Sequence, residues 1–225
     1  IIRSVRTWLW DESIGGPRLN TNFNEMRLDL GRCFGFAYGH KENGAMFTHM
    51  AVMYAYALYQ RGYVEEGYAV LNGIYQHVQN FPVARMLPGL PEYIEPTGRG
   101  VYPFLTGSAS WYLFTLLTQS FGVKGYMGDL LLDPKLTLAQ FDESGKASVS
   151  TEFAGKRLTI IYYNERKLEY GTYQITHCKL DGKKLPFASG LCIQIPKETL
   201  ININFESETL IEVYLGIHSG EREND

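Results

Sequence analysis

The chain has few cysteines, and they are not arranged to hold a metal or a disulfide framework. Cys33, Cys178 and Cys192 are widely separated, and no Cys-x-x-Cys pair occurs among the 225 residues. Their number is odd and the first residues, IIRSVRTWLWDESIGG, show no signal-peptide pattern, so we expect reduced thiols and a cytoplasmic protein. The same segment lacks an initiator methionine, and we expect the chain to begin inside a longer protein. The sequence predicts no metal site and no cofactor.

Long basic runs and long apolar runs are missing as well. Lys and Arg number 21 against 24 Asp and Glu, which gives a formal net charge of -3. This balance argues against nucleic acid or an anionic membrane surface as a partner. The longest apolar stretches are far shorter than a membrane span. What remains is a globular composition with 45% hydrophobic residues, sufficient for one or two cores.

The first half of the sequence has helical periodicity. A helix is expected from Glu42 to a C-cap at Gly62, because apolar residues recur there at helical spacing: Met46, Met50, Met53, Tyr54, Ala57 and Leu58. A second helix is predicted over 64–78, and a third over 107–122, which is apolar on most faces and should be buried. The connection over 80–103 is rich in Pro and Gly, and its length and its aromatic and charged residues favour a functional loop.

After Gly122 the pattern changes to short β-rich runs. They are ASVSTEFA, RLTIIYYN, GTYQITHCKL, LCIQIP, LININF and LIEVYLGI. The Asp-Gly pair in KLDGKKL predicts a hairpin, and the run over 157–164 is apolar on both faces, as two packed sheets require. The final segment, HSGEREND, is polar and should be frayed. We therefore predict an α+β protein with a helical domain over 1–122 and an antiparallel β-sandwich over 123–225.

His49 is the first candidate for chemistry. It follows the turn at Asn43 and Gly44 and lies between Met46 and Met53 at helical spacing, so its ring should face the packed side. The simplest interpretation is a core histidine whose ring nitrogens are satisfied by neighbours. The alternative is an anion ligand, because the first turn of a helix leaves N–H groups unpaired and carries partial positive charge.

Thr106, Gly107 and Ser108 repeat this arrangement ahead of the third helix. They offer hydroxyls and unpaired N–H groups at a helix start. Taken singly, Thr106 or Ser108 is an ordinary N-cap and Gly107 lets the chain turn tightly. Together with His49, they would allow two helix starts to share one anion.

Several of these segments resemble a known family. ENGAMFTH, the later LTGSASW and the FGV and GDLLLDPKL stretches are similar to the C-terminal part of the cellobiose-phosphorylase-like family of inverting glycoside phosphorylases. The resemblance covers nearly the whole chain. RLNTNF and GRCFGFAYGHKENG most resemble the β-1,2-oligoglucan phosphorylases, with cellobiose and cellodextrin phosphorylases and the C-terminal module of cyclic β-1,2-glucan synthases as relatives.

The resemblance implies the C-terminal portion of an (α/α)6 barrel followed by a small jelly-roll-like sandwich. It also implies that His49, Thr106 and Gly107 bind inorganic phosphate, the co-substrate that attacks the anomeric carbon with inversion. His49 would then be a cationic anion ligand and would not transfer a proton. An inverting hydrolase needs two carboxylates roughly 6.5 to 9.5 Å apart, whereas here a phosphate cradle replaces the second carboxylate.

The family's general acid is an aspartate in a Trp-Asn-Asp context, and no such motif occurs in this sequence. We therefore expect no catalytic residue in this chain and place the general acid upstream, together with an arginine that the family also uses for phosphate. Asp11 and Glu12 are expected to lie on a solvated helix edge or in a loop turn. The rest of its own polypeptide is thus an expected partner.

The segment LPEYIEPTGRG resembles the family's acceptor-sugar loop, which makes Glu92, Tyr93 and Glu95 candidate sugar ligands. The order PEYIEP differs from the IEPYVY of cellobiose phosphorylases, so their disaccharide specificity is not carried over. The simpler alternative is that both glutamates are solvated and that one pairs with Arg99. Trp111 is expected in the packed core and not as a sugar platform.

The function expected from the resemblance is phosphorolysis of β-linked gluco-oligosaccharides to glucose 1-phosphate by a longer enzyme, of which this piece supplies the phosphate cradle and the acceptor loop. The alternatives are a noncatalytic carbohydrate-binding or scaffold module and the C-terminal module of a cyclic glucan synthase. Part of a helical barrel should expose apolar helix faces, so we also expect a homodimer or co-purification with the remaining polypeptide.

Overall fold

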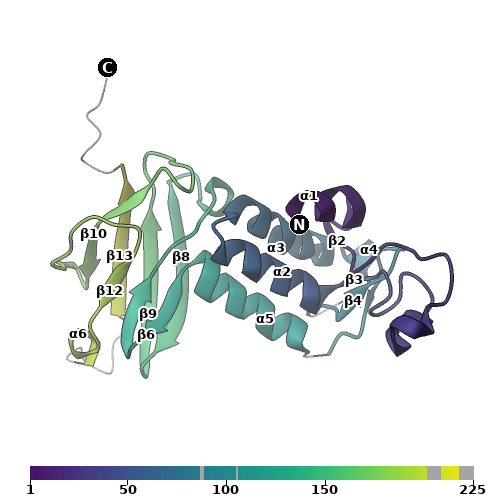
Figure 1. The fold of residues 1–225 in the computed structure, drawn as a ribbon. Coiled ribbons are helices and arrows are strands. Elements are labelled where there is room, and N and C mark those ends of the chain that lie inside the picture. Colours follow the sequence, from purple (N-terminus) through teal and green to yellow (C-terminus); the bar gives the residue numbers. More distant parts are fainter. Residues whose placement is uncertain (87–88, 105, 202–208, 218–225) are drawn as a thin grey trace, which may run out of the picture. The chain divides into compact units, whose positions relative to one another are not determined.

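The computed structural model describes residues 1–86, 89–104, 106–201 and 209–217 and shows a mixed α+β protein with helices and several mainly antiparallel sheets (Figure 1). The chain divides into two compact units, Ile1–Leu116 and Leu117–Asp225. The expected boundary at 122/123 lies a few residues further along. A π-type turn, Leu116–Ser120, spans the division between the units.

The first unit contains the main helices and two small sheets. Its helices are α1 (Ile2–Ser4), α2 (Thr48–Gln60), α3 (Val64–Gln79), α4 (Phe81–Ala84) and α5 (Gly107–Thr115). Its strands are β1 (Trp10–Asp11), β2 (Gly16–Pro17), β3 (Met46–Phe47), β4 (Tyr93–Ile94) and β5 (Gly100–Val101). A π-type turn (Val5–Leu9) and 3-10 turns (Leu28–Leu30, Arg32–Gly35) connect them. Helix α2 lies between α3 and α5 and packs against both (Figure 1).

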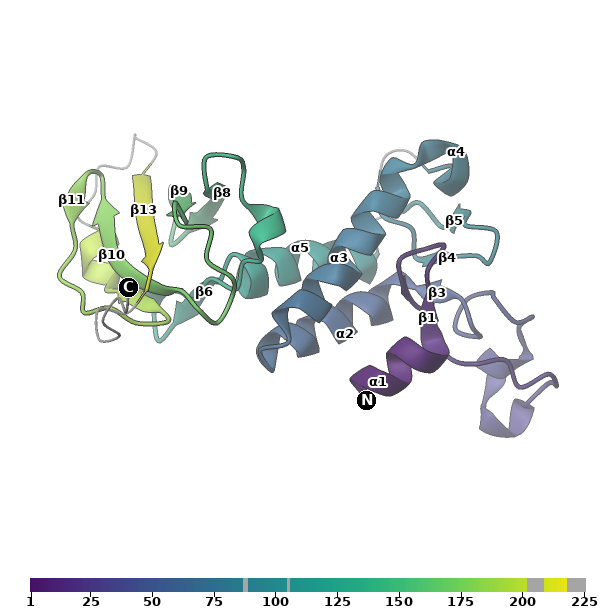
Figure 2. The ribbon, with the colours of Figure 1, turned by 90° about the horizontal axis from the view of Figure 1, so that it is seen from above.

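Helix α2 begins later than the periodicity predicts. Met46 and Phe47 pair with Ile94 and Tyr93 of β4, and the N–H of Thr48 donates to the carbonyl of Glu92 at 2.9 Å. This pairing holds the chain extended up to Phe47, so the expected start at Glu42 is wrong. His49 consequently lies in the first turn of the helix. Figure 2 shows β3 and β4 beside this end of α2.

The end of α2 and the course of α3 agree with the sequence. Gly62 has φ +79°, its N–H donates to the carbonyl of Tyr59, and the N–H of Tyr63 donates to the carbonyl of Leu58. These two bonds form a Schellman cap, which needs a residue in the left-handed region and therefore favours glycine. The predicted C-cap at Gly62 is confirmed. Helix α3 follows at once and buries Val70, Leu71 and Ile74, whereas Tyr75 is exposed.

Helix α5 is less buried than expected. Its apolar residues Leu113 and Phe114 are exposed at 65% and 47%, and on the neighbouring α2, Met50 and Met53 are exposed as well. The prediction of a helix covered on most faces is wrong for the described part of the chain, because no described element packs against these side chains closely enough to bury them. The 80–103 connection is not a plain loop either, since it contains α4, β4 and β5.

The second unit consists of a five-stranded sheet, in the order β11-β10-β13-β9-β8, and a three-stranded sheet, in the order β12-β7-β6. The strands are β6 (Val123–Tyr126), β7 (Asp129–Leu132), β8 (Lys146–Phe153), β9 (Lys156–Tyr163), β10 (Gln174–Leu180), β11 (Lys183–Lys184), β12 (Ile193–Ile195) and β13 (Thr209–Gly216). A 3-10 turn (Leu138–Gln140) and helix α6 (Lys197–Ile201) complete the unit.

Among the described strands of this unit, one pairing departs from the expected antiparallel pattern. Strand β13 pairs with β9 in parallel, with Thr209 opposite Leu158. The predicted strand over 200–205 is wrong at its start, because residues 200 and 201 end α6, and the rest of it lies outside the described residues, as does the tail over 218–225. The hairpin at Asp181 and Gly182 is confirmed, and both residues have positive φ, as a type I′ turn requires.

Both sheets contribute to one buried cluster. Alternate residues of β9 are fully buried in it, while Thr159, Ile161 and Tyr163 between them are half-buried on the other face. Members from the two sheets are Val123, Leu130, Leu132, Leu158, Ile160, Tyr162, Ile175, Cys178, Ile193, Ile195, Ile211 and Val213. On the other face Tyr163 stacks on Tyr214, with ring centroids 4.7 Å apart. The prediction that β9 is apolar on both faces is confirmed.

We predict that Gly73→Ala destabilises the helical unit. A Cβ at this position of α3 would overlap the carbonyl oxygen of Gly15, so the backbone must shift, which costs about 1–3 kcal/mol. Urea unfolding followed by tryptophan fluorescence tests this, because Trp8, Trp10 and Trp111 all lie in the first unit.

Gln76→Ala on the exposed side of the same helix is the control and should change stability by less than about 0.5 kcal/mol. Helix propensity alone would raise the free energy of unfolding of Gly73→Ala by about 1 kcal/mol. Such an increase would contradict the close approach of Gly73 to Gly15.

Candidate functional site

Two helix starts meet in the first unit, one carrying His49 and the other Gly107. Helix α5 has Thr106 as N-cap, with extended backbone and its Oγ1 accepting a hydrogen bond from the N–H of Ser108 at 3.2 Å. A hydroxyl in this position satisfies one of the N–H groups that have no partner within the helix. Thr106 thus acts as the N-cap, which is the simpler of its two expected roles.

The imidazole of His49 lies directly against Gly107. A Cβ on residue 107 would be 2.7 Å from Cε1, 2.9 Å from Nδ1 and 3.1 Å from Nε2 of His49. Any side chain at 107 would therefore displace the ring. The structure brings together His49, Gly107 and, next to it in sequence, Thr106, the three residues that the family resemblance assigns to a phosphate site.

Buried polar atoms without partners occur at both of these helix starts. Nε2 of His49, Oγ1 of Thr48 and Oγ of Ser108 are buried and make no hydrogen bond to any described residue. The side chains of Thr48 and Ser108 are fully buried. A buried polar group without a partner costs about 1–3 kcal/mol, so a ligand that supplies the missing bonds would be favoured here. The simple interpretation, a core histidine with satisfied nitrogens, does not describe Nε2.

Aromatic rings border the histidine on one side. The ring centroid of Trp111 is 6.1 Å from that of His49, and Trp111 contacts Tyr56 edge-on at 5.5 Å. Tyr56 in turn stacks on Phe114 with the ring planes 16° apart. Trp111 is half-buried, in part as expected for a core residue, and it packs beside the candidate site.

The segment that resembles the family's acceptor-sugar loop is joined to the start of α2 by a backbone hydrogen bond. Glu92 accepts the Thr48 N–H bond with its carbonyl, so this loop abuts the start of α2. Tyr93 is only 5% exposed because its ring lies between Phe47, at 6.4 Å, and Tyr102, at 6.0 Å. Burial, and secondarily the negative charge of Glu95, raises the pKa of Tyr93 above its usual value of 10.0. Tyr93 thus supports the loop and presents little ring surface.

Glu95 and Tyr102 stand at the edge of this loop. Oε1 of Glu95 lies 3.7 Å from Nδ1 of His40, and the carboxylate is half-buried, so the expected alternative of a solvated glutamate paired with Arg99 does not describe it. Tyr102 is 38% exposed and has φ +58°, and the Nζ of Lys41, itself at φ +49°, lies 5.2 Å from its ring. Positive φ at non-glycine residues is strained and concentrates at functional sites. The sequence carried no local signal for Tyr102.

Asp11 belongs to a partly buried ion pair and not to a solvated edge. Its Oδ2 accepts from the Arg18 guanidinium, and both side chains are 16% exposed. Burial on its own raises the pKa of the Asp11 carboxyl, but the hydrogen bonds from Ser13 and Arg18 and the charge of Arg18 outweigh it, so the pKa lies below 3.8. Asp11 is therefore ionised near neutral pH and unsuited to protonate a leaving group. Glu12 is exposed.

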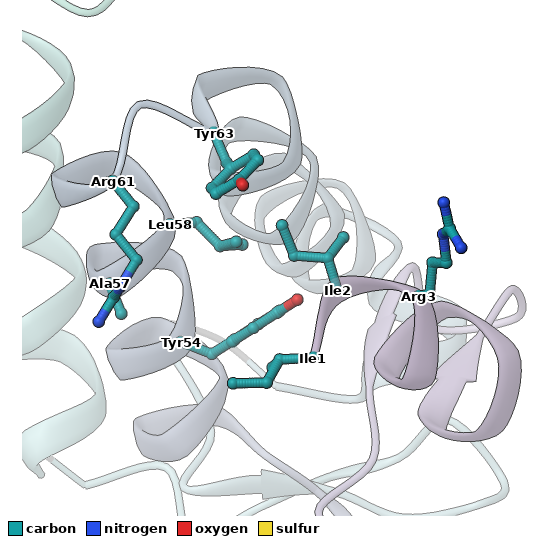
Figure 3. Close-up of a pocket in the computed structure, with 8 residues that line it drawn as sticks. All are labelled: Ile1, Ile2, Arg3, Tyr54, Ala57, Leu58, Arg61 and Tyr63. Carbon is teal, nitrogen blue, oxygen red and sulfur yellow. The ribbon is translucent and has the colours of Figure 1, made fainter.

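An apolar cleft of about 690 Å³ lies elsewhere in the unit, between the first residues and the end of α2 (Figure 3). Ile1, Ile2, Tyr54 and Leu58 point into it, while the Arg3 side chain points away. Neither His49 nor Gly107 lines this cleft. Among the described residues no three His, Cys, Asp or Glu side chains are grouped to hold a metal ion. No helix in the described part of the chain has the length and apolar character needed to cross a membrane.

Comparisons with known proteins give no independent assignment. No family model matches the chain, and no curated protein matches it.

We predict that Asp11→Asn lowers the free energy of unfolding by about 2 kcal/mol at pH 7, because charge-assisted hydrogen bonds from Arg18 and Ser13 are lost. The pKa of Asp11 is depressed in the folded protein, so its contribution is present above the unfolded value of 3.8 and is lost as pH falls through the folded pKa. The difference between variant and wild type should thus shrink below pH 3.8.

Urea unfolding at pH 7 and pH 3, again followed by tryptophan fluorescence, measures both quantities. Glu12→Gln, at an exposed neighbouring carboxylate, is the control and should show little effect at either pH. If Asp11→Asn loses the same free energy of unfolding at pH 7 and at pH 3, the pair of Asp11 and Arg18 makes no pH-dependent contribution to stability.

Proposed function

We propose that this chain is part of an inverting glycoside phosphorylase that cleaves β-linked gluco-oligosaccharides with inorganic phosphate and releases α-glucose 1-phosphate. The observation that carries the proposal is the His49 ring lying against Gly107 at two helix starts, with Nε2 buried and unpaired within the described residues. The motif resemblance assigns the same residues to phosphate.

The chemistry of this place suits an oxyanion. Backbone N–H groups at a helix start and the helix dipole favour negative charge. Thr106 Oγ1 accepts the Ser108 N–H, which leaves its own hydroxyl proton available to donate to a ligand. A cationic imidazole adds a charge-assisted hydrogen bond. His49, Thr106 and Gly107 would hold a phosphate oxygen each, with Thr48 and Ser108 hydroxyls beside them.

In the proposed reaction a phosphate oxygen forms a bond to the anomeric carbon as the glycosidic carbon–oxygen bond breaks on the opposite face. A carboxylic acid protonates the departing sugar oxygen. The cradle orients the phosphate and holds its charge in place, so no general base is required. The proton donor comes from the remaining polypeptide, since Asp11 is ion-paired and the Trp-Asn-Asp motif is absent from this sequence.

The leaving oligosaccharide would bind at the loop that follows Glu92. Glu95 supplies a half-buried carboxylate, and Glu92 adjoins the start of α2 through its carbonyl. Tyr102 adds exposed ring surface over Tyr93, so the aromatic contact to sugar is assigned to the pair, with Tyr93 as support.

The finer architecture is part of the proposal. The first unit would be the C-terminal helices of an (α/α)6 barrel, which accounts for the exposed apolar residues Met50, Met53, Leu113 and Phe114. The second unit, with two sheets around one core, would be the jelly-roll-like sandwich. We also propose that the protein forms a homodimer and is cytoplasmic.

We expect the chain to bind inorganic phosphate and His49→Gln and Gly107→Ala to weaken that binding by about tenfold or more, the equivalent of one charge-assisted hydrogen bond. Gly107→Ala acts by pushing the imidazole away. Titration calorimetry with phosphate measures the affinity, and His40→Gln, at an exposed histidine of the same unit, should bind as wild type does. If wild type and the three variants bind phosphate with equal affinity, phosphate does not bind between these two helix starts.

The activity itself is tested in the longer polypeptide that contains the proton donor. With phosphate and β-linked gluco-oligosaccharides it should form glucose 1-phosphate, and the 225-residue chain alone should form none. Failure of the longer protein across linkages would favour a noncatalytic carbohydrate-binding module. Turnover by the chain alone would show that the proton donor lies within it.

A further inference from the structure

The turn that leads into the His49 helix is held by side chains from an earlier part of the chain. Asn43 and Gly44 form this turn, and Asp11, Arg18 and Asn20 surround it. We refer to the last three residues as the clamp. The Asn-Gly pair by itself predicts a flexible turn. In the structure both Asn43 and Gly44 are buried, and side chains of the clamp bind the turn.

Arg18 fixes the carbonyl of Gly44. Its Nη1 donates to that oxygen at 3.0 Å, while Nη2 donates to Oδ2 of Asp11. Asp11 is held in turn by the N–H of Ser13, which donates to Oδ1 at 2.9 Å. A guanidinium with two such partners has little freedom, and a planar fork loses less entropy per hydrogen bond than an ammonium does.

Asn20 fixes the amide of the same residue. Its Oδ1 accepts from the N–H of Gly44 at 2.9 Å, and its Nδ2 donates to Oδ1 of Asn43 at 3.1 Å. Nδ2 of Asn43 then donates to the carbonyl of Phe36 at 2.6 Å. Both peptide groups of Gly44 are thus bound by clamp side chains, and its φ of +77° is compatible with glycine.

The clamped turn leads directly into the candidate site. The N–H of Leu19 donates to the carbonyl of Ala45 at 3.0 Å, and the next two residues form β3. Thr48 and His49 follow as the first residues of α2. A shift of Gly44 would therefore be transmitted to the imidazole through a short segment that is held by backbone hydrogen bonds at Ala45 and Thr48. The ring has little room to move, since it already contacts Gly107.

We propose that Asp11, Arg18 and Asn20 are positioning residues that set the placement of His49, and through it the affinity for phosphate, without touching the anion. This inference rests on the proposed phosphate site. It assigns a role to a carboxylate and an arginine that the reaction itself leaves unused. At metal sites, groups that orient the ligands alter affinity by about tenfold to a hundredfold when removed, and we expect an effect at the lower end of this range here.

The test compares Asn20→Ala, Asn20→Asp and Arg18→Lys with wild type in the full chain. Asn20→Asp keeps the acceptor for the Gly44 amide but loses the Nδ2 donor to Asn43, and Arg18→Lys keeps the charge beside Asp11 but loses the fork. Arg27→Ala is the control, because Arg27 forms a comparable but exposed pair with Asp29. Two readouts are taken: the phosphate dissociation constant, and the imidazole proton and nitrogen chemical shifts of His49 in the folded protein, assigned with His49→Gln.

We expect Asn20→Ala to weaken phosphate binding about tenfold and to move the His49 shifts, and Asn20→Asp, which keeps one of the two clamp bonds, to weaken it less than Asn20→Ala does. Unchanged affinity and unchanged His49 shifts in a folded Asn20→Ala would overturn the proposal, since a purely structural role lowers only the melting temperature. If Asn20→Ala does not fold, Arg18→Lys decides by the same two readouts. If wild type binds no phosphate, the proposed function fails, and the His49 shifts alone decide the clamp.

Discussion

The contact between the His49 ring and the bare backbone of Gly107 is the constraint on which the site depends. A glycine at this point lets two helix starts approach closely enough for an imidazole to lie against the first turn of α5. Thr48 and Ser108, at the same two helix starts, are fully buried, and their hydroxyls have no partner among the described residues. These hydroxyls and Nε2 of His49 gain hydrogen bonds when a ligand supplies them, which is the usual logic of a preformed binding site.

The second constraint is the short pairing between β3 and β4. It delays the start of α2 until Thr48 and joins the loop after Glu92 to that start by a backbone hydrogen bond. One pairing thus places His49 in the first helical turn and brings the loop with Glu95 and Tyr102 alongside. The Gly44 turn, which precedes β3 in the chain, is bound by Arg18 and Asn20. Three segments that are distant in sequence determine where one ring lies.

Features with a local physical cause could be predicted from the sequence. Gly62 ends α2, Asp181 and Gly182 form a hairpin, and the period of two in β9 matches its burial, because each depends on neighbouring residues only. Features set by distant residues could not. The start of α2, the parallel pairing of β13 with β9 and the exposure of Leu113 are of this kind. His49, Thr106 and Gly107 were identified by motif, while the positions of Arg18, Asn20 and Tyr102 required the structure.

The central claim is that one phosphate ion binds where the two helix starts meet. A crystal structure of the chain soaked with phosphate tests it most directly. The account predicts a phosphate with oxygens about 2.7–3.0 Å from Nε2 of His49 and from the backbone nitrogen of Gly107, the range of charge-assisted hydrogen bonds. A phosphate bound elsewhere, or a His49 ring turned away from Gly107 with both nitrogens paired to protein groups, would contradict it.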